Sequence, residues 1–407
     1  MSSYDALASL LSAHMDDILA ELGIKGVFNA EGDAWRTQRR LSVAALAQRH
    51  VRELYPSIRM VATRLKARWD RAAAQDETLD VVEELKRFTV DVTMLIVFGH
   101  DSNTVEKSDD VIQRHLEVVF PGINRRLFAL APTWRYFRTS SDKRLDRALK
   151  AIRVWLDALL VEGRARLASD PDRAQKPSNF LEAMLKSVDD KGEPFPDDVI
   201  MSNLITMLLA GEDTTAYTLA WSVHHLCDSP EWVERIRSEA DSVLGPLDTS
   251  DSLETANKLA VANAVANETM RLRPVGPIGL IDANMDTSLG DYFVPEGTNI
   301  AVLTRLGAVD PANFVDPLGF RPERWLKDVD GPNALSVPIP FGVGPRICPG
   351  RSLALVEMKT LLSMLYKNFD VERAGAASDV TERFGFAMSP EGVKARLAPR
   401  RVLAAAQ

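Results

Sequence analysis

Cysteine is scarce in this chain, because its 407 residues contain only Cys227 and Cys348. Two cysteines are too few for a disulfide framework, so each must be explained by packing, metal ligation or chemistry, and a reducing, intracellular setting is expected. Runs of basic side chains are also absent, and 49 Lys and Arg residues face 57 Asp and Glu residues, which gives a net charge of -8. Nucleic acid is therefore not expected as a partner.

Long uninterrupted apolar runs are missing as well. The first 24 residues lack a basic start and carry acidic side chains such as Asp5 and Glu21, which predicts an amphipathic helix rather than a signal peptide. The apolar stretch 201–221 is broken at its centre by charged and hydroxyl side chains, whereas a membrane span needs about 20 uninterrupted apolar residues. We therefore expect a cytoplasmic protein without a membrane anchor.

The chain does contain a strong helical pattern over residues 1–275, where apolar side chains recur three and four residues apart. After Pro274, the β-prone run 299–304 and a hairpin pattern around Pro390 predict small sheets. No repeat or linker divides the chain, and 46% hydrophobic residues can build a sizeable core. We predict a mainly α fold with small β-sheets in a single domain, with the mixed region over 276–407.

The most specific segment is the loop 341–350, FGVGPRICPG, which precedes a long helical pattern without breakers. Cys348 therefore lies just before a helix N-terminus, where free N–H groups and the helix dipole favour a thiolate. Gly342 and Gly350 allow the backbone to turn tightly and approach a flat ring, and Arg346 can pair with a carboxylate on the same ligand. For an arbitrary cysteine, a buried structural role is the alternative.

A polar notch, AGEDTT, lies within the apolar stretch 201–221. Gly211 weakens the helix, and the hydroxyls of Thr214 and Thr215 can compete for main-chain carbonyls, so a distortion or groove is expected. An acid beside an alcohol, as in Asp213 and Thr214, can relay protons. Taken alone, such a notch is more often a helix irregularity than an active site.

Two further spacings place side chains on a shared helix face: Glu268 with Arg271, and Trp35 with Arg39. An exposed ion pair of the first kind is worth under about 1 kcal/mol, and the second spacing is also compatible with an ordinary amphipathic helix. Neither spacing is informative without the other segments.

Together these segments resemble the cytochrome P450 family. The loop matches the haem-binding pattern F-x-x-G-x-R-x-C-x-G at every fixed position, and the notch is similar to the family's A-G-x-D/E-T-T motif. The two remaining pairs match E-x-x-R and W-x-x-x-R, in the family's order. The resemblance implies the P450 fold and haem b (iron protoporphyrin IX) held through its iron by Cys348.

The resemblance also implies roles for individual residues. Asp213 and Thr214 would manage protons, and Thr215 would cap or pack. Arg324, in the string PERW, would complete a buried structural charge network with Glu268 and Arg271, although Trp325 replaces the family's Phe. The residues expected to bind the cofactor are Trp35, Arg39, Ala210, Gly211, Phe341, Gly342, Arg346, Cys348 and Gly350. Ile281 occupies the position where the family often has a propionate-binding arginine, so Arg346, Trp35 and Arg39 would carry more of that task.

The implied activity is a monooxygenase that inserts one oxygen atom of O2 by hydroxylation or epoxidation. The expected substrate pocket is formed by Leu209, Ala210, Val275, Gly276, Ile278 and Phe386, whose uncharged side chains suggest a lipophilic substrate. A separate ferredoxin or flavodoxin-like protein, with its reductase, would supply electrons on the Cys348 side. The candidate basic contacts are Arg36, Arg40, Arg351 and Lys359, and Phe128, Trp134 and Phe137 belong either to a mobile lid or to the core.

Two alternatives remain open. A peroxygenase would use H2O2 directly, but usually replaces the acid and alcohol pair with other polar groups. A non-catalytic or impaired haem-binding protein is the alternative from another class, because only 34 residues precede Trp35, where the family has an early helix and strands. We expect a soluble, bacterial-type member that is shortened at its N-terminus or whose true start lies upstream.

Overall fold

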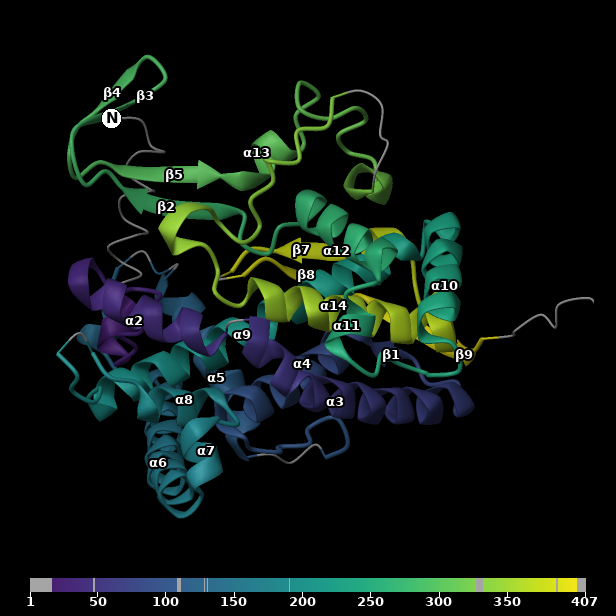
Figure 1. Ribbon diagram of the computed structural model, residues 1–407. Coiled ribbons are helices and arrows are strands. Elements are labelled where there is room, and N and C mark those ends of the chain that lie inside the picture. The colour runs from purple at the N-terminus through teal and green to yellow at the C-terminus, as the bar shows by residue number, and fades with distance from the viewer. Residues whose placement is uncertain are drawn as a thin grey trace, which may run out of the picture.

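The computed structural model in Figure 1 describes residues 17–46, 48–107, 111–127, 129, 131–189, 191–326, 332–385 and 387–400. These residues form a mainly helical body with small antiparallel sheets, so the predicted fold class is confirmed. Most of the predicted N-terminal helix lies outside the described residues, although residues 17–21 are helical. Within the described part of the chain, no helix has the length and apolar character needed to cross a membrane.

The helices are α2 (Gly32–Ala45), α3 (Gln48–Ala74), α4 (Val81–Phe98), α5 (Val111–Leu127), α6 (Ser140–Ser169), α7 (Pro171–Gln175), α8 (Phe180–Lys186), α9 (Asp197–Leu226), α10 (Pro230–Leu244), α11 (Leu253–Ala256), α12 (Ala260–Leu272), α13 (Thr304–Ala308) and α14 (Arg351–Asn368). Local sequence signals set several helix ends. The carboxylate of Asp80 accepts hydrogen bonds from the first N–H groups of α4, and Gly99 ends that helix with a φ of 67°, a left-handed conformation that favours glycine.

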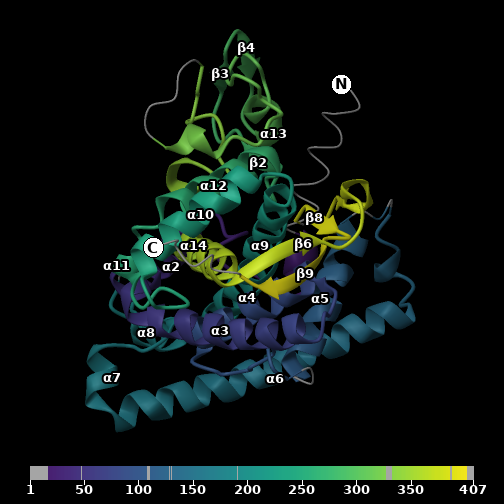
Figure 2. The same cartoon turned by 90° about the vertical axis from the view of Figure 1, so that its right-hand side faces the viewer.

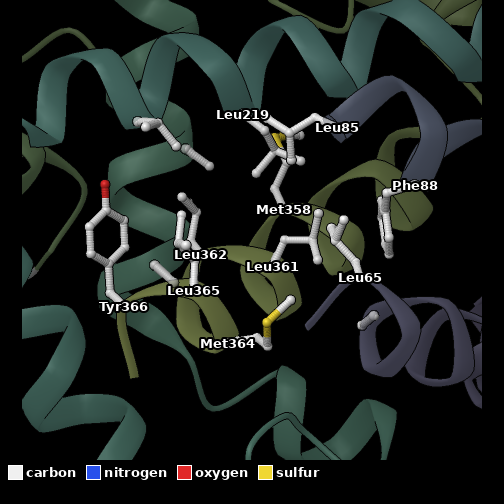
Figure 3. Close-up of a cluster of buried hydrophobic side chains, with 14 of the residues drawn as sticks. Leu65, Leu85, Phe88, Leu219, Met358, Leu361, Leu362, Met364, Leu365 and Tyr366 are labelled. Atoms are coloured by element: carbon white, nitrogen blue, oxygen red, sulfur yellow. The ribbon is translucent and has the colours of Figure 1, made fainter. Parts of the chain in front are cut away.

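Helix α9 is the central helix of the fold and packs against α4, α12 and α14. One hydrophobic cluster packs α3, α10, α12 and α14 against its second half, and another packs α5, α6 and α8 against its first half. In Figure 3, Met358 and Leu361 of α14 lie between Leu219 of α9 and Leu65 of α3. Each such buried side chain stabilises the fold by about 1.5–3 kcal/mol, so the position of α9 is fixed from several sides.

The sheets are small, and all their strand pairs are antiparallel. Strand β9 (Lys394–Pro399) pairs with both β1 (Leu79–Asp80) and β6 (Phe369–Arg373). The other pairs are β2 (Ile278–Asp282) with β5 (Asn299–Leu303), β3 (Thr287–Leu289) with β4 (Tyr292–Val294), and β7 (Thr381–Arg383) with β8 (Ser389–Glu391). Figure 2 shows β6 and β9 side by side, well apart from β3 and β4.

The prediction of a hairpin that turns around Pro390 is wrong, because the segments before and after this residue do not pair with each other. Pro390 lies inside β8, which pairs back to β7, whereas β9 belongs to a different sheet. Gly392, with a φ of 84°, turns the chain between the two sheets. Alternate side chains of the last segment, Val393, Ala395 and Leu397, are buried, and this burial fixes β9 against the core rather than against β8.

Candidate active site

Cys348 lies in a tight turn between a short 3-10 helix, η3 (Gly344–Arg346), and α14. Its backbone N–H donates to the carbonyl of Phe341 (2.8 Å), which closes the loop. Gly342 and Gly344 have φ values of 71° and 69°, conformations that other residues rarely adopt. Burial raises the pKa of the Cys348 thiol, and hydrogen bonds from the backbone N–H groups that follow it oppose this rise.

The surroundings of this thiol suit a flat ligand. Cys348 is accessible to solvent, although the protein atoms around its sulfur displace enough water to disfavour the charged thiolate. A Cβ atom added at Gly342 or Gly276 would meet no atom within 4 Å, and Ala210 is exposed on α9 directly after buried residues. A soft thiolate with adjacent guanidinium groups matches a ligand that carries both iron and carboxylates, so the residues present fit haem.

Helix α2 contacts the cysteine loop through three of the predicted cofactor residues. The guanidinium of Arg39 donates to the carbonyl of Ile347 (2.5 Å), and that of Arg346 lies 4.7 Å from the centre of the Trp35 ring. Arg346 also forms an ion pair with Glu31 at 2.8 Å. The structure thus brings Trp35, Arg39 and Arg346 together beside Cys348. Sequence reasoning missed Glu31 as a partner, because nothing in the spacing links the two segments.

Glu268, Arg271 and Arg324 form one buried cluster, with exposed side-chain fractions of 0%, 0% and 1%. Arg271 donates twice to the Glu268 carboxylate (2.8 and 2.7 Å), and Arg324 donates once (3.3 Å). Trp325 Nε1 donates to the same carboxylate at 3.0 Å. An indole supplies this hydrogen bond and a phenyl ring would not, so the departure from the family's Phe adds a contact.

Both arginines of this cluster also donate hydrogen bonds to backbone carbonyls of residues 308–317. Arg271 donates to the carbonyls of Ala308 (2.6 Å) and Pro317 (2.7 Å), and Arg324 donates to those of Val315 (2.6 Å) and Asp316 (2.7 Å). The cluster therefore ties α12 to the irregular segment that follows α13. The carboxylate neutralises one of the two buried positive charges, and the backbone carbonyls accept hydrogen bonds from both guanidinium groups.

The notch does not break helix α9. The hydroxyl of Thr214 donates to the carbonyl of Ala210 (2.9 Å), and Thr218 does the same toward Thr214 (2.9 Å). Each bond returns to the carbonyl four residues earlier, so the hydroxyls follow the helix instead of diverting it. The expected distortion at Gly211 is therefore not a helix break. A Cβ at Gly211 would lie 2.7 Å from the Thr93 hydroxyl, so glycine allows α4 to approach closely.

The acid of the notch faces α4. Lys86 Nζ lies 3.1 Å from Asp213 Oδ1 and 3.6 Å from Glu212 Oε1. Burial by itself would lower the pKa of Lys86, but the two carboxylates outweigh burial and hold it above its usual value. Tyr217, one turn after Asp213, has a raised pKa because of burial and the nearby Asp213 charge. Asp213 thus pairs with a lysine while Thr214 bonds within its own helix.

Sequence reasoning missed both Lys86 and Tyr217. The spacing of Tyr217, four residues after Asp213 on a helix, was an available signal. Lys86 gave no such signal, because its pairing depends on α4 packing against α9.

Three of the six expected pocket residues, Val275, Gly276 and Ile278, lie just after the end of α12. Val275 and Ile278 are half-buried, Gly276 is exposed, and Leu209 is buried on α9. Phe386 lies outside the described residues, as does Phe128. Of the other two aromatic residues considered for a lid, Trp134 is buried and donates to Glu21 (2.9 Å), whereas Phe137 is 77% exposed.

The candidate basic contacts differ in exposure. Arg36 and Arg40 are exposed on α2, and Arg351 is exposed at the start of α14, directly after the cysteine loop. Lys359 is only 8% exposed and donates to Asn257 at 2.9 Å, so it does not belong to an exposed basic surface. Its position on the inner face of α14 explains the difference.

A family model described as cytochrome P450 matches residues 10–397. The chain therefore belongs to the cytochrome P450 family, whose members bind haem and are monooxygenases. It is 29% identical over 392 residues to the Arabidopsis thaliana protein LUTEIN DEFICIENT 5, chloroplastic. This match covers 92% of the chain and 64% of the relative. The human Cytochrome P450 4F8 is 30% identical over 365 residues, or 85% of this chain and 69% of the relative.

Among solved structures, the chain is similar to the heme domain of cytochrome P450DA, with a TM-score of 0.84 and 22% sequence identity. This similarity covers 95% of the chain and 82% of that domain. At this level of identity, the likeness establishes the fold alone.

Proposed function

We propose that this chain is a haem-thiolate monooxygenase that inserts one oxygen atom of O2 into a lipophilic substrate. The observation that carries the proposal is the setting of Cys348, which lies in a glycine-shaped loop before α14 with backbone N–H donors directed at its sulfur. Cys348 would hold the iron of haem b, and Arg39, Arg346 and Trp35 would hold its carboxylates. When bound, the haem supplies electron-driven activation of O2.

The protein's own groups would then control protons and substrate. Thr214 presents its hydroxyl beside the exposed Ala210, and Asp213 with Lys86 provides a charged pair one residue away. These groups can hold and move protons beside the ring. The uncharged side chains of Leu209, Val275 and Ile278 favour a substrate rich in hydrocarbon.

Electrons would come from a separate ferredoxin or flavodoxin-like protein with its reductase. Arg36, Arg40 and Arg351 support this proposal, because they are exposed close to the cysteine loop and would attract an acidic donor. We also propose that the protein works in the cytoplasm, since a chain with two unpaired cysteines suits a reducing compartment.

The test is the absorption spectrum of the purified, dithionite-reduced protein with carbon monoxide. We expect a strongly red-shifted Soret band that is lost in Cys348→Ala and retained in Cys227→Ala, because Cys348 lies in the loop and Cys227 does not. Absence of haem, or a band without that shift, would contradict thiolate ligation and the proposed function with it.

A second candidate is a haem-binding protein with impaired catalysis. The pairing of Asp213 with Lys86 on α4, rather than with Thr214, favours it. Normal carbon monoxide spectra without NADPH-dependent product, over a lipophilic substrate panel and several redox partners, would support this candidate. Product formed with H2O2 alone would instead indicate a peroxygenase.

A further inference from the structure

Glu382 on β7 joins two arginines from different parts of the fold. Arg273, at the end of α12, donates to Glu382 Oε2 at 3.0 Å. Arg305, in α13, donates to both carboxylate oxygens at 3.1 and 2.8 Å. All three side chains are partly buried, with exposed fractions of 30% for Arg273, 35% for Arg305 and 19% for Glu382. A partly buried carboxylate that pairs with two arginines restricts the positions of the side chains more than an isolated surface ion pair does.

The two arginines flank the same loop from its two ends. Arg273 directly precedes residues 274–278, which contain three of the six proposed pocket residues. Arg305 directly follows Thr304, whose N–H and hydroxyl both donate to the carbonyl of Pro277 (3.0 and 3.1 Å). Glu382 is therefore linked to the start of the 274–278 loop through Arg273, and to Pro277 near its end through Arg305 and the adjacent Thr304.

The hairpin that carries Glu382 contacts this wall directly. The N–H of Met388 donates to the carbonyl of Val275 at 2.8 Å. At the hairpin tip, a Cβ on Gly385 would lie 3.1 Å from the Asn124 amide of α5. Of the described residues between β7 and β8, Gly385 thus lies beside α5 and Met388 lies beside the proposed pocket wall.

A hairpin of this size is not stable alone. Strands β7 and β8 pair over only three residues each, and two-stranded hairpins are marginal in water. Its position therefore depends on bonds to the rest of the fold. Arg273 is itself held in place, because its guanidinium lies 4.9 Å from the centre of the Trp221 ring of α9.

We propose that Glu382 is a positioning residue that fixes the β7–β8 hairpin against the 274–278 loop and so determines which carbon of the substrate is oxidised. This inference rests on the proposed function, because it assigns the two segments to the substrate pocket. A hairpin freed from its anchor would let a flexible hydrocarbon chain shift along the pocket, and such small displacements change reaction rates strongly.

The anchor is tested first by hydrogen exchange on the resting, haem-loaded protein without turnover. In Glu382→Gln, we expect the backbone amides of 381–391 to exchange about ten-fold faster than in the wild type. The matched control is Glu391→Gln on the same hairpin, which removes only the exposed pair with Arg383 (3.1 Å) and should leave exchange unchanged. Unchanged exchange in Glu382→Gln, or the same increase in both variants, overturns the proposal.

Selectivity is tested with dodecanoic acid as the substrate probe, with a ferredoxin, its reductase and NADPH. We expect Glu382→Gln to change the ratio of products at neighbouring carbons by about three-fold while total turnover changes less, and Glu382→Asp to restore part of the native ratio. An unchanged ratio despite faster exchange overturns the role in selectivity. A wild type that binds haem but forms no product over a lipophilic substrate panel and several redox partners contradicts the proposed function instead, and the exchange result still decides whether Glu382 anchors the hairpin.

Discussion

At the scale of single residues, Lys86 is the cation that the structure places beside both carboxylates of the notch. Replacing Lys86 with Met would remove its ion pairs with the buried Glu212 and Asp213, and breaking a buried pair is costly. We expect the free energy of unfolding to fall by about 2 kcal/mol, measured by urea denaturation, since Lys86 is not fully buried. The control Lys66→Met breaks pairs with Asp70 and Asp248, whose carboxylates are 49% and 61% exposed, and should cost less than about 1 kcal/mol. Equal losses in the two variants would contradict the importance of the buried pair.

His225 provides a residue-scale prediction on pH. Burial, with smaller effects from His224 and Arg273, lowers its pKa to about 3, and Asp228 opposes this only weakly. Between this value and about 6.5, the unfolded chain binds a proton that the folded chain does not, so stability is present above pH 6.5 and is lost as pH falls. Replacing His225 with Gln should therefore reduce the slope of unfolding free energy against pH between about 6.5 and 4.5. A slope equal to that of the wild type would show that His225 is not buried in its neutral form.

At the scale of elements, Glu268 joins α12 to the short 3-10 helix η2 (Pro322–Trp325). In Glu268→Gln, Arg271 and Arg324 would keep their charges without the carboxylate, so we expect a loss of about 3–5 kcal/mol. Trp325→Phe removes one hydrogen bond to a charged group and should cost about 1.5–3 kcal/mol. Urea unfolding of both variants measures the two losses. A larger loss for Trp325→Phe than for Glu268→Gln would contradict the ranking.

Elements that depend on one continuous segment could be predicted from the sequence, whereas contacts between distant elements could not. The Cys348 loop and α14 follow from local signals, because glycines, a helix start and an unbroken apolar pattern lie within one segment. The partners of that loop, Glu31 and Ala30, lie more than 300 residues away and follow only from how α2 packs. The pairing of β8 was mispredicted because a turn pattern at Gly392 marks a change of direction but not the sheet that the next strand joins.

At the scale of the whole molecule, strands β2 to β5 extend to one side of the helical body, whereas β7 and β8 lie against it. Helix α9 is fixed by two hydrophobic clusters, whereas β2 with β5 and β7 with β8 form isolated two-stranded sheets. Burial therefore holds the proton-handling groups of α9, whereas Val275, Gly276 and Ile278 of the proposed pocket lie next to two-stranded sheets. This division predicts that substitutions around the sheets change selectivity before they change global stability.

Charge distribution gives the last prediction, since a chain of net charge -8 must attract an acidic electron donor through a local basic surface. Arg351 lies exposed at the start of α14, three residues after Cys348. We expect Arg351→Gln to slow association with an acidic ferredoxin by about three-fold at low salt, and the difference to vanish near 1 M salt, where charges are screened within about 3 Å. Stopped-flow reduction at increasing ionic strength measures this effect. Arg383→Gln, on the β7–β8 hairpin and 73% exposed, removes one equal charge and should have no effect. Equal slowing by both substitutions would mean that net charge, rather than a surface beside the cysteine loop, guides the donor.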